Sequence, residues 1–168
     1  MGNAQARFEA LVHAWSADLY RFAYWLCRDR AWAEDLVQET FLRAWRALGS
    51  LREEKAAKGW LLTILRNEYA RSLAKKTEVH DAPADEPAFE TMAPEEAWLL
   101  RRELFKLSGE YIEPLLLQVL GGHSCEEIAQ TLGISRAAVM TRLFRARQRL
   151  RAVLEESPSG PVSREVVR

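Results

Sequence analysis

The chain has 168 residues and carries 24 Lys and Arg against 24 Asp and Glu, so its formal net charge is zero. That length suits one domain or two small ones, each able to bury a core. No run of about 18 apolar residues is present, which argues against a membrane-spanning helix. The first residues also lack the basic stretch and apolar run of a secretory signal. We expect a cytoplasmic protein that makes no membrane contact of its own.

Charge is sorted by segment rather than spread evenly along the chain. Residues 78–96 contain seven acids and no Lys or Arg, whereas residues 135–151 contain six arginines and no acid. Such sorting is typical of a chain that has a nucleic-acid-binding face and an acidic connector, which a net charge of zero hides.

The two cysteines, Cys27 and Cys125, lie far apart and form no CxxC pair. This pattern fits free thiols in a reducing compartment. His123 and Cys125 stand two residues apart beside Glu126, but two potential ligands on one turn are too few for a metal site. We therefore expect a surface histidine, a half-buried thiol, and no metal or cofactor.

Helical spacing of apolar residues predicts three helices in the first half of the chain, over about residues 4–27, 31–48 and 60–76. Asp29 is placed to cap the second of them. Three helices joined by short turns can bury one shared core, so we expect an all-helical domain over residues 1–76. The apolar stripes are Phe8, Leu11, Val12, Trp15, Leu19, Phe22, Ala23 and Leu26; then Leu36, Val37, Phe41, Ala44, Trp45 and Leu48; then Trp60, Leu61, Ile64, Leu65 and Leu73.

Residues 77–94 break this pattern, because three prolines stand among acids with little apolar content. That composition predicts a flexible acidic linker. Helical spacing resumes in a second domain over residues 95–156, and residues 157–168 have the composition of a disordered tail. Pro114 would lose a backbone donor in mid-helix, so we expect the helix that contains it to start just before it.

The second domain contains a helix-turn-helix pattern. Ser124 and Glu127 have the spacing of a capping box, so a helix should begin there. Gly133 is the residue type that most easily turns the chain after a short helix, and Ser135 can cap the next helix. The buried stripe of that next helix is Val139, Leu143, Ala146, Leu150 and Val153.

The outward face of that last helix is basic and aromatic. Roughly opposite its stripe lie Ala137, Thr141, Phe144, Arg145 and Gln148, and Arg142 and Arg149 flank it. An α-helix fits the major groove, where Arg can pair with a guanine edge and Phe or Thr can touch a thymine methyl. The pattern therefore predicts a DNA-binding helix-turn-helix. The alternative is a solvated basic face without a ligand; the cap, the turn and the exposed Phe144 together favour DNA binding.

Three segments together resemble the bacterial sigma factors of the extracytoplasmic-function type, in the sigma-70 superfamily. The region-two segment that binds the polymerase β′ subunit is similar to residues 33–48, AEDLVQETFLRAWRAL. The segment that recognises and melts the minus-10 element is similar to residues 58–73, KGWLLTILRNEYARSL. Region four, which reads the minus-35 element, is similar to residues 126–150, EEIAQTLGISRAAVMTRLFRARQRL. The resemblance implies an all-α fold of two small helical domains joined by a flexible linker, the second containing the helix-turn-helix.

The resemblance also implies an alternative sigma factor that joins core RNA polymerase, through the β′ clamp helices and the β flap, and directs it to promoter DNA. It implies control by an anti-sigma factor and no catalytic activity. The polymerase-binding residues would be Asp35, Gln38, Glu39 and Phe41. The minus-10 residues would be Arg52, Lys55, Lys58, Asn67, Arg71, Lys75 and Lys76, with the base pocket in the loop of residues 51–56. The minus-35 residues would be Arg136, Thr141, Arg142, Phe144, Arg145, Arg147 and Gln148.

The residue types suit these roles. An acidic, hydrogen-bonding surface for a basic partner would comprise Glu34, Asp35, Gln38, Glu39 and Thr40. The alternative is that these acids only favour the dipole near a helix start. Trp60 invites base stacking, but its place on the apolar stripe favours core packing. Two positions depart from the family pattern, since Met140 stands where Lys or Arg is usual and Ser108 where a proline usually opens a helix.

Two other functions fit parts of the sequence. A helix-turn-helix regulator that binds operators as a dimer shares the C-terminal half but leaves the residues of the first domain without a role. A nuclease could use the adjacent acids Glu34 and Asp35, or Glu53 and Glu54. Neighbouring acids on a helix point about 100° apart and do not converge on one metal, so the sigma-like function is favoured.

Overall fold

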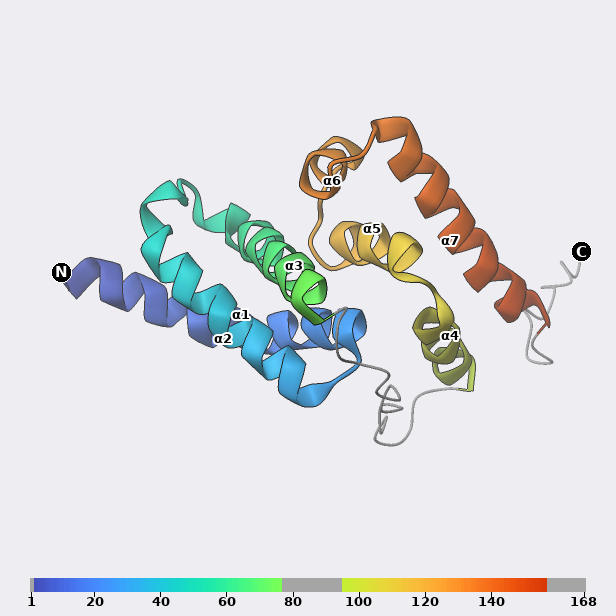
Figure 1. Ribbon diagram of the computed structural model, residues 1–168, viewed down its shortest axis with the longest axis horizontal. Helices are drawn as coiled ribbons and strands as arrows, with labels where there is room; N and C mark the ends of the chain where they lie inside the picture. The colour runs from blue at the N-terminus through green and yellow to red at the C-terminus, as the bar shows by residue number, and fades with distance from the viewer. Residues whose placement is uncertain (1, 77–94, 157–168) are drawn as a thin grey trace, which may run out of the picture.

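The computed structural model describes residues 2–76 and 95–156, and the predicted linker and tail lie outside these ranges. All regular elements of the described residues are helical, which confirms the all-α prediction. Figure 1 shows their course. The N-terminal group contains α1 (Gly2–Cys27), α2 (Arg30–Arg46), the 3-10 turns η1 (Leu48–Ser50) and η2 (Glu54–Ala56), and α3 (Ala57–Lys76). The C-terminal group contains α4 (Glu95–Lys106), α5 (Gly109–Val119), α6 (Cys125–Leu132) and α7 (Arg136–Glu156).

The core of the N-terminal group forms where α1, α2 and α3 pack on one another. The predicted cap is confirmed, because the Asp29 carboxylate accepts a hydrogen bond from the Trp32 backbone N–H at 2.9 Å. Most of the predicted stripe is buried. Leu73 is the exception on α3 and is exposed, because it lies beyond Tyr69, the last buried residue of that helix. Trp45 on α2 is also exposed, at 45%, and its ring centre lies 5.1 Å from that of Phe8.

The C-terminal group packs α5, α6 and α7 around buried aliphatic side chains, among them Leu117, Ile128 and Val139. The prediction that the helix of Pro114 starts just before it is wrong, since α5 starts at Gly109. Ser108 takes the N-cap position, and its carbonyl accepts bonds from the backbone N–H groups of the first turn. Helix α5 tolerates Pro114 because the proline removes only one backbone N–H donor. Burial of the proline ring in the core compensates for that loss.

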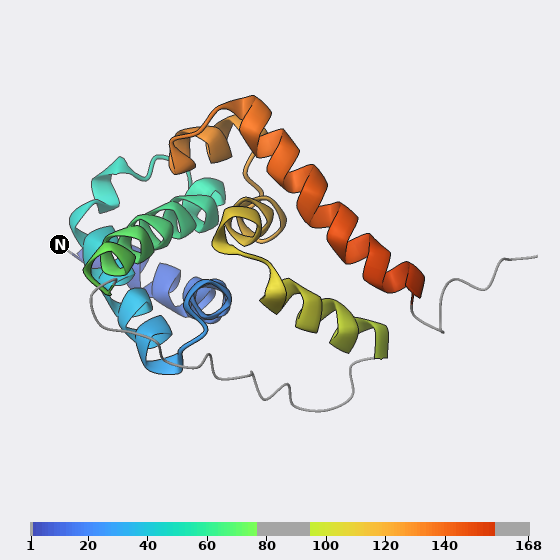
Figure 2. The same cartoon turned by 45° about the vertical axis from the view of Figure 1, so that its right-hand side comes forward.

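The two groups also pack against each other. Their buried side chains form one continuous cluster, and α1 contacts α5. Figures 1 and 2 agree that α3 lies beside α5 and α6, and that α7 runs along the outer side of the C-terminal group. One face of α3 is therefore covered, whereas the outer face of α7 is open.

Candidate nucleic-acid interfaces

The start of α6 and the turn from α6 into α7 are built by local hydrogen bonds, as predicted. Ser124 Oγ accepts a bond from the Glu127 N–H at 3.1 Å, and the Glu127 carboxylate accepts one from the Ser124 N–H at 2.9 Å. Gly133 ends α6 in the left-handed conformation with φ of 66°, and Ser135 Oγ accepts a bond from the Ala138 N–H at 3.1 Å. Gly133 and Ser135 thus form the turn from α6 into α7.

The outer face of α7 is open, in agreement with the sequence pattern. Its stripe residues Val139 and Leu143 are buried, while Phe144 is 65% exposed. The exposed members of the predicted minus-35 set are Arg136, Thr141, Phe144, Arg145, Arg147 and Gln148. The exposed phenyl ring lies next to Arg145 in the chain, so this face presents an apolar group beside a cation, the combination that suits base edges in a major groove.

Two arginines of the predicted minus-35 set also contact α5. Arg142 Nε lies 3.5 Å from Glu110 Oε1, and its side chain is only 28% exposed. Arg147 donates a hydrogen bond to the Gln118 side chain. These contacts hold both side chains toward the α5 side of α7, whereas Arg145 is exposed on the outer face. The helical spacing places Arg142 at the flank of the buried stripe, and the family resemblance assigns all three arginines to DNA binding.

The predicted minus-10 residues fall on different sides of α3. Asn67 and Arg71 line a hollow of about 340 Å³ against α2, and Lys75 lines a neighbouring hollow of about 390 Å³. Lys55 and Lys58 instead line a hollow of about 680 Å³ that faces the C-terminal group. None of these three hollows is lined both by residues of the loop 51–56 and by Asn67 or Arg71. Arg52 is exposed in that loop, and the side chain of Lys76 lies outside the described residues.

The predicted polymerase-binding surface lies on α2. The exposed side chains there are Asp35, Gln38 and Glu39, as expected. Phe41 is half-buried, and its ring centre lies 6.1 Å from that of Phe8 in an edge-to-face arrangement. The expectation that Thr40 belongs to this surface is wrong: its side chain is fully buried and donates a hydrogen bond to the Leu36 carbonyl at 2.6 Å.

Arg66, which lies outside the predicted apolar stripe of α3, joins this helix to the C-terminal group. Its guanidinium lies 3.3 Å from Glu113 Oε2 on α5 and donates to the Thr131 carbonyl on α6 at 3.3 Å. Burial raises the pKa of the Glu113 carboxyl above its ordinary value, and the nearby Arg66 charge partly opposes this rise. Both side chains are mostly shielded from water, so this ion pair belongs to the packing between the groups.

A second contact between the groups lies at the C-terminal end of α1. Arg28 donates a hydrogen bond to the Leu107 carbonyl at 3.0 Å, and its guanidinium sits 5.3 Å from the centre of the Phe105 ring. Desolvation lowers the pKa of Arg28. The Trp25 ring centre is 4.4 Å from that of Phe105. The same region contains Tyr69, whose pKa rises to about 12, mainly because of burial.

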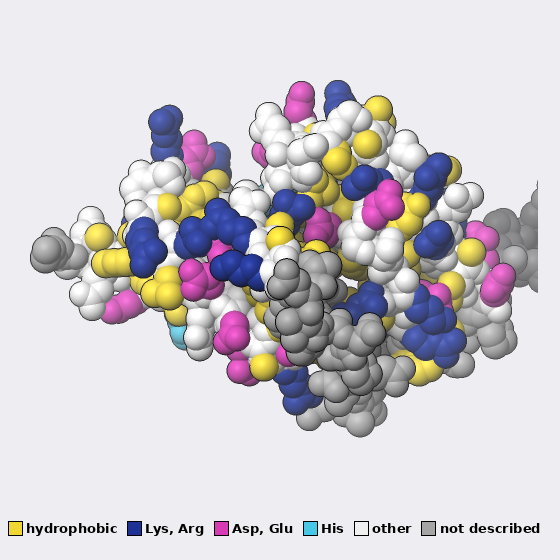
Figure 3. Space-filling model, viewed as in Figure 1, with side chains coloured by type: hydrophobic (Ala, Val, Ile, Leu, Met, Phe, Trp, Pro, Cys, Tyr) yellow, Lys and Arg dark blue, Asp and Glu magenta, His cyan; other side chains and the backbone are white. Residues whose placement is uncertain are grey.

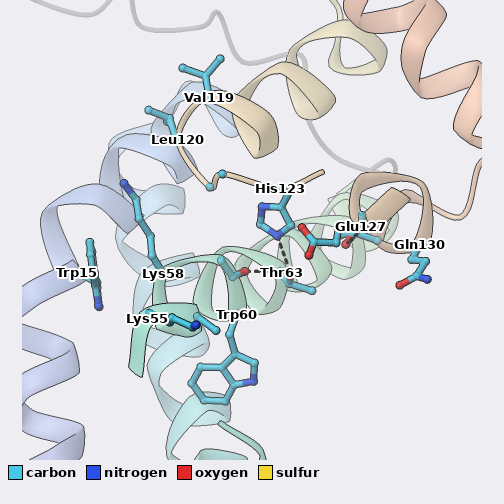
Figure 4. Close-up of a pocket in the computed structure, with 15 residues that line it drawn as sticks. Trp15, Lys55, Lys58, Trp60, Thr63, Val119, Leu120, His123, Glu127 and Gln130 are labelled. Atoms are coloured by element: carbon cyan, nitrogen blue, oxygen red, sulfur yellow. Dashed lines mark hydrogen bonds between the residues drawn. The ribbon is translucent and has the colours of Figure 1, made fainter. Parts of the chain in front are cut away.

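The third contact is made by His123, which the sequence pattern placed on the surface. That expectation is wrong, since His123 is only 9% exposed. Its Nδ1 lies 3.0 Å from the Leu117 carbonyl. Its Nε2 lies 3.1 Å from Thr63 Oγ1 on α3, a contact drawn as a dashed line in Figure 4. The backbone of Gly121 is so close to the imidazole that a Cβ there would clash with the ring. Cys125 is half-buried, as predicted.

Sequence reasoning missed the basic wall of the hollow between α2 and α3. Arg43 and Arg46 from α2 line the same hollow as Asn67 and Arg71, and Glu68 from α3 lies between them. The signal was weak, because two basic residues in the last turn of a helix are expected for its dipole alone. Within the described residues, no group of three or more His, Cys, Asp or Glu side chains is placed to hold a metal ion.

Comparison with known proteins identifies the family. Sigma-70 region 2 matches residues 11–79, and sigma-70 region 4 matches residues 98–150. The ECF RNA polymerase sigma factor SigL of Mycobacterium tuberculosis is 32% identical over 160 residues, covering 90% of each chain. The ECF RNA polymerase sigma factor SigM of Bacillus subtilis is 33% identical over 147 residues, covering 81% of this chain and 88% of that one.

A solved structure agrees with these matches. The sigma factor RpoE from Bartonella quintana, in complex with the anti-sigma factor NepR, superposes with a TM-score of 0.70 and 27% identity, covering 94% of this chain and 99% of that one. The helical fold and these matches define a protein of the sigma factor class. The chain belongs to the extracytoplasmic-function group of the sigma-70 family. Within the described residues, no helix has the length and apolar character needed to cross a membrane.

Proposed function

We propose that this protein joins core RNA polymerase as an alternative sigma factor and directs it to promoters that carry minus-35 and minus-10 elements. The observation that carries the proposal is the open, basic and aromatic face of α7, set behind a capped helix-turn-helix, on a chain matched by both sigma regions. We assign minus-35 readout to residues 95–156, and polymerase binding and strand opening to residues 1–76. The linker between them would cross the polymerase.

In the C-terminal group, α7 enters the major groove. Arg145 and Phe144 lie on its open face and contact base edges, and Arg136 at the start of the helix meets a phosphate. Arg142 and Arg147, which bond to α5, contribute charge at the edge of the footprint. Each group offers only a modest face, so binding to free duplex DNA is weak and becomes strong only when polymerase holds both groups together.

In the N-terminal group, the acidic side chains of α2 meet the β′ clamp helices. Asp35, Gln38 and Glu39 are exposed on consecutive turns and offer carboxylate and amide acceptors to a basic helix. The two neighbouring hollows between α2 and α3 form one groove. Its other end is basic and is lined by Arg43, Arg46, Asn67 and Arg71. This end receives the single strand that becomes available when the minus-10 element opens.

An anti-sigma factor controls this activity in our proposal. The neighbour RpoE was solved in complex with the anti-sigma factor NepR, and its similarity covers 94% of this chain. The packing of the two groups here supports a state in which α3 is partly covered. We also infer that the protein has no catalytic activity of its own, as its family consists of transcription regulators, and that it works in the cytoplasm, where core polymerase and promoters are found.

The proposal is tested by transcription in vitro with core polymerase on a pool of promoter fragments, with and without the protein. Transcripts that start at defined sites only when the protein is present are the expected result. Alignment of the upstream sequences should then give two conserved elements. Absence of new start sites, together with a symmetric two-half-site footprint by the protein alone, would replace the proposal with a dimeric helix-turn-helix regulator.

A further inference from the structure

A buried carboxylate stands under the basic hollow between α2 and α3. Glu68 on α3 is only 6% exposed. Its Oε1 accepts a hydrogen bond from Arg71 Nη1 at 3.0 Å, and the same oxygen forms an ion pair with Arg43 Nε on α2. Glu39 adds a weaker contact to the same Arg43 nitrogen at 3.8 Å. One carboxylate thus connects two arginines from two helices.

The two arginines remain available to a ligand despite this contact. Their side chains are 40% and 56% exposed, for Arg43 and Arg71 respectively. A guanidinium has five N–H donors in a rigid plane, and the oxygen of Glu68 uses only part of that set. The contact with Arg43 is an ion pair and the contact with Arg71 is a hydrogen bond, and both arginines line the hollow beside Asn67.

The hollow has the size and lining of a site for a nucleotide backbone. Arg43, Arg46, Asn67 and Arg71 surround a volume of about 340 Å³, and the adjoining hollow of about 390 Å³ shares Arg43, Glu68 and Arg71 as its wall. Figure 3 shows Lys and Arg side chains gathered over the part of the molecule where α2 and α3 run side by side. The first hollow is lined by three arginines and one carboxylate, so its lining has a net positive charge. The adjoining hollow also has Asp35, Glu39 and Lys75 in its lining.

We propose that Glu68 is a positioning residue of the DNA-binding face, which fixes Arg43 and Arg71 so that they hold the phosphates of the opened strand in register beside Asn67. This rests on the proposed function, since it assumes that the α2–α3 groove receives the minus-10 strand. Phosphate contacts set the register in which neighbouring groups read bases. The same carboxylate removes one unit of positive charge and so limits attachment to strands of any sequence.

A positioning role and a purely structural role for Glu68 predict different salt dependences of the affinity for single-stranded DNA. Binding of a cationic site to single-stranded DNA loses affinity with salt by a slope of about 0.7 per phosphate contact. If glutamine replaces Glu68, the negative charge beside the two arginines is lost, and so is the contact that positions their side chains. Attachment to a strand of arbitrary sequence then strengthens, while the preference for the correct strand falls. A carboxylate that merely stabilises the fold would weaken both when removed.

The test uses Glu68→Gln in the full chain assembled with core polymerase, on single strands that carry the minus-10 element found by promoter transcription and on scrambled strands. We expect affinity for the scrambled strand to rise about two- to fourfold, as for one unit charge near one phosphate in water with salt screening. The salt slope should steepen by up to about 0.7, and the ratio of matched to scrambled affinity should fall. Binding to core polymerase should not change.

The control is Glu9→Gln, which makes the same change of charge at an exposed position on α1 where Glu9 accepts a hydrogen bond from Gln5 at 2.9 Å. This variant should keep the wild-type slope and ratio. Arg71→Gln provides a second background. The Arg71 side chain is 56% exposed, so its replacement should not prevent folding. In this background, Glu68→Gln should alter the salt slope less than it does in the wild type. Equal weakening on both strands with an unchanged slope, or no change at all, overturns the role of Glu68. Failure of the wild type to direct transcription overturns the proposed function instead.

Discussion

Arg66 on α3 and Glu113 on α5 form an ion pair at 3.3 Å that joins the N-terminal group to the C-terminal group. The pair is largely shielded from water, and it is accompanied by the Thr63 contact to His123 and the Arg28 contact to the Leu107 carbonyl. Removing one partner of a shielded pair leaves the other charge desolvated. The arrangement of the two groups should therefore respond to changes at Glu113.

Charge reversal at Glu113 should separate the groups. In Glu113→Arg, two guanidinium groups would face each other across a partly dehydrated contact, and the packed arrangement becomes unfavourable. Small-angle X-ray scattering should show a larger radius of gyration for this variant than for the wild type. Glu126→Arg changes an exposed acid on α6 by the same charge and should keep the wild-type radius. An unchanged radius in Glu113→Arg would show that this pair does not hold the groups together.

The raised pKa of Glu113 gives a pH dependence of known sign. A carboxyl whose pKa is higher in the folded state than in the unfolded state binds more protons when folded. Its contribution to the unfolding free energy is therefore largest at low pH and falls as the pH rises above the ordinary value through the folded value. Relative to Glu113→Gln, which has no such proton, the wild type should lose stability as the pH rises above 4.5, the ordinary pKa of a glutamate side chain. Urea unfolding of both proteins at several pH values measures the difference in their unfolding free energies. If the wild type becomes more stable relative to Glu113→Gln as the pH rises, the pKa of Glu113 is not raised in the folded state.

Arg145 on the open face of α7 should contribute to minus-35 recognition without affecting polymerase binding. Loss of one base contact by an arginine costs about 1–3 kcal/mol, so Arg145→Ala should reduce transcription from a promoter that depends on its minus-35 element by about five- to a hundredfold. Affinity for core polymerase should stay at the wild-type value. Arg21→Ala, at an exposed position on α1, is the matched control. Parallel loss of transcription and of polymerase binding would mean that the substitution damages folding.

The capping box of α6 should stabilise the C-terminal group. Ser124→Ala removes the oxygen that accepts the Glu127 N–H, which typically costs about 1 kcal/mol. Thermal unfolding should show a lower midpoint. The exposed face of α7 is untouched, so promoter selection should be kept at temperatures where the variant is folded. An altered set of start sites would indicate that the cap also sets the angle of α7 on DNA.

The local parts of this fold could be predicted from sequence because their signals lie within a few residues. The capping box needs only Ser124 and Glu127, and the left-handed turn needs only Gly133. The stripe of α7 follows from spacing alone, and Val139 and Leu143 are buried as predicted. Each of these features depends on short-range hydrogen bonds or on helical periodicity, which the sequence records directly.

The features that could not be predicted depend on which helices meet. Arg66 lies on a polar side of α3, and only the packing of α5 and α6 against that side turns it into an ion-pair partner. His123 is buried for the same reason. In the sequence, Glu68 is not distinguished from other acids on predicted helices. Its ion pair with Arg43 forms only because α2 packs against α3. Pro114 misled the placement of α5, because burial of its ring compensates for the lost hydrogen bond.

The central claim, that one chain reads two promoter elements within polymerase, is tested most directly by footprinting and permanganate probing on a promoter selected by transcription. With core polymerase and the protein together, we predict protection around the minus-35 element and reactive thymines in the minus-10 region. Arg145→Ala should lose the upstream protection first. Neither signal should arise with core polymerase alone or with the protein alone. Protection of two symmetric half-sites by the protein alone, with no reactive thymines when polymerase is added, would contradict the account.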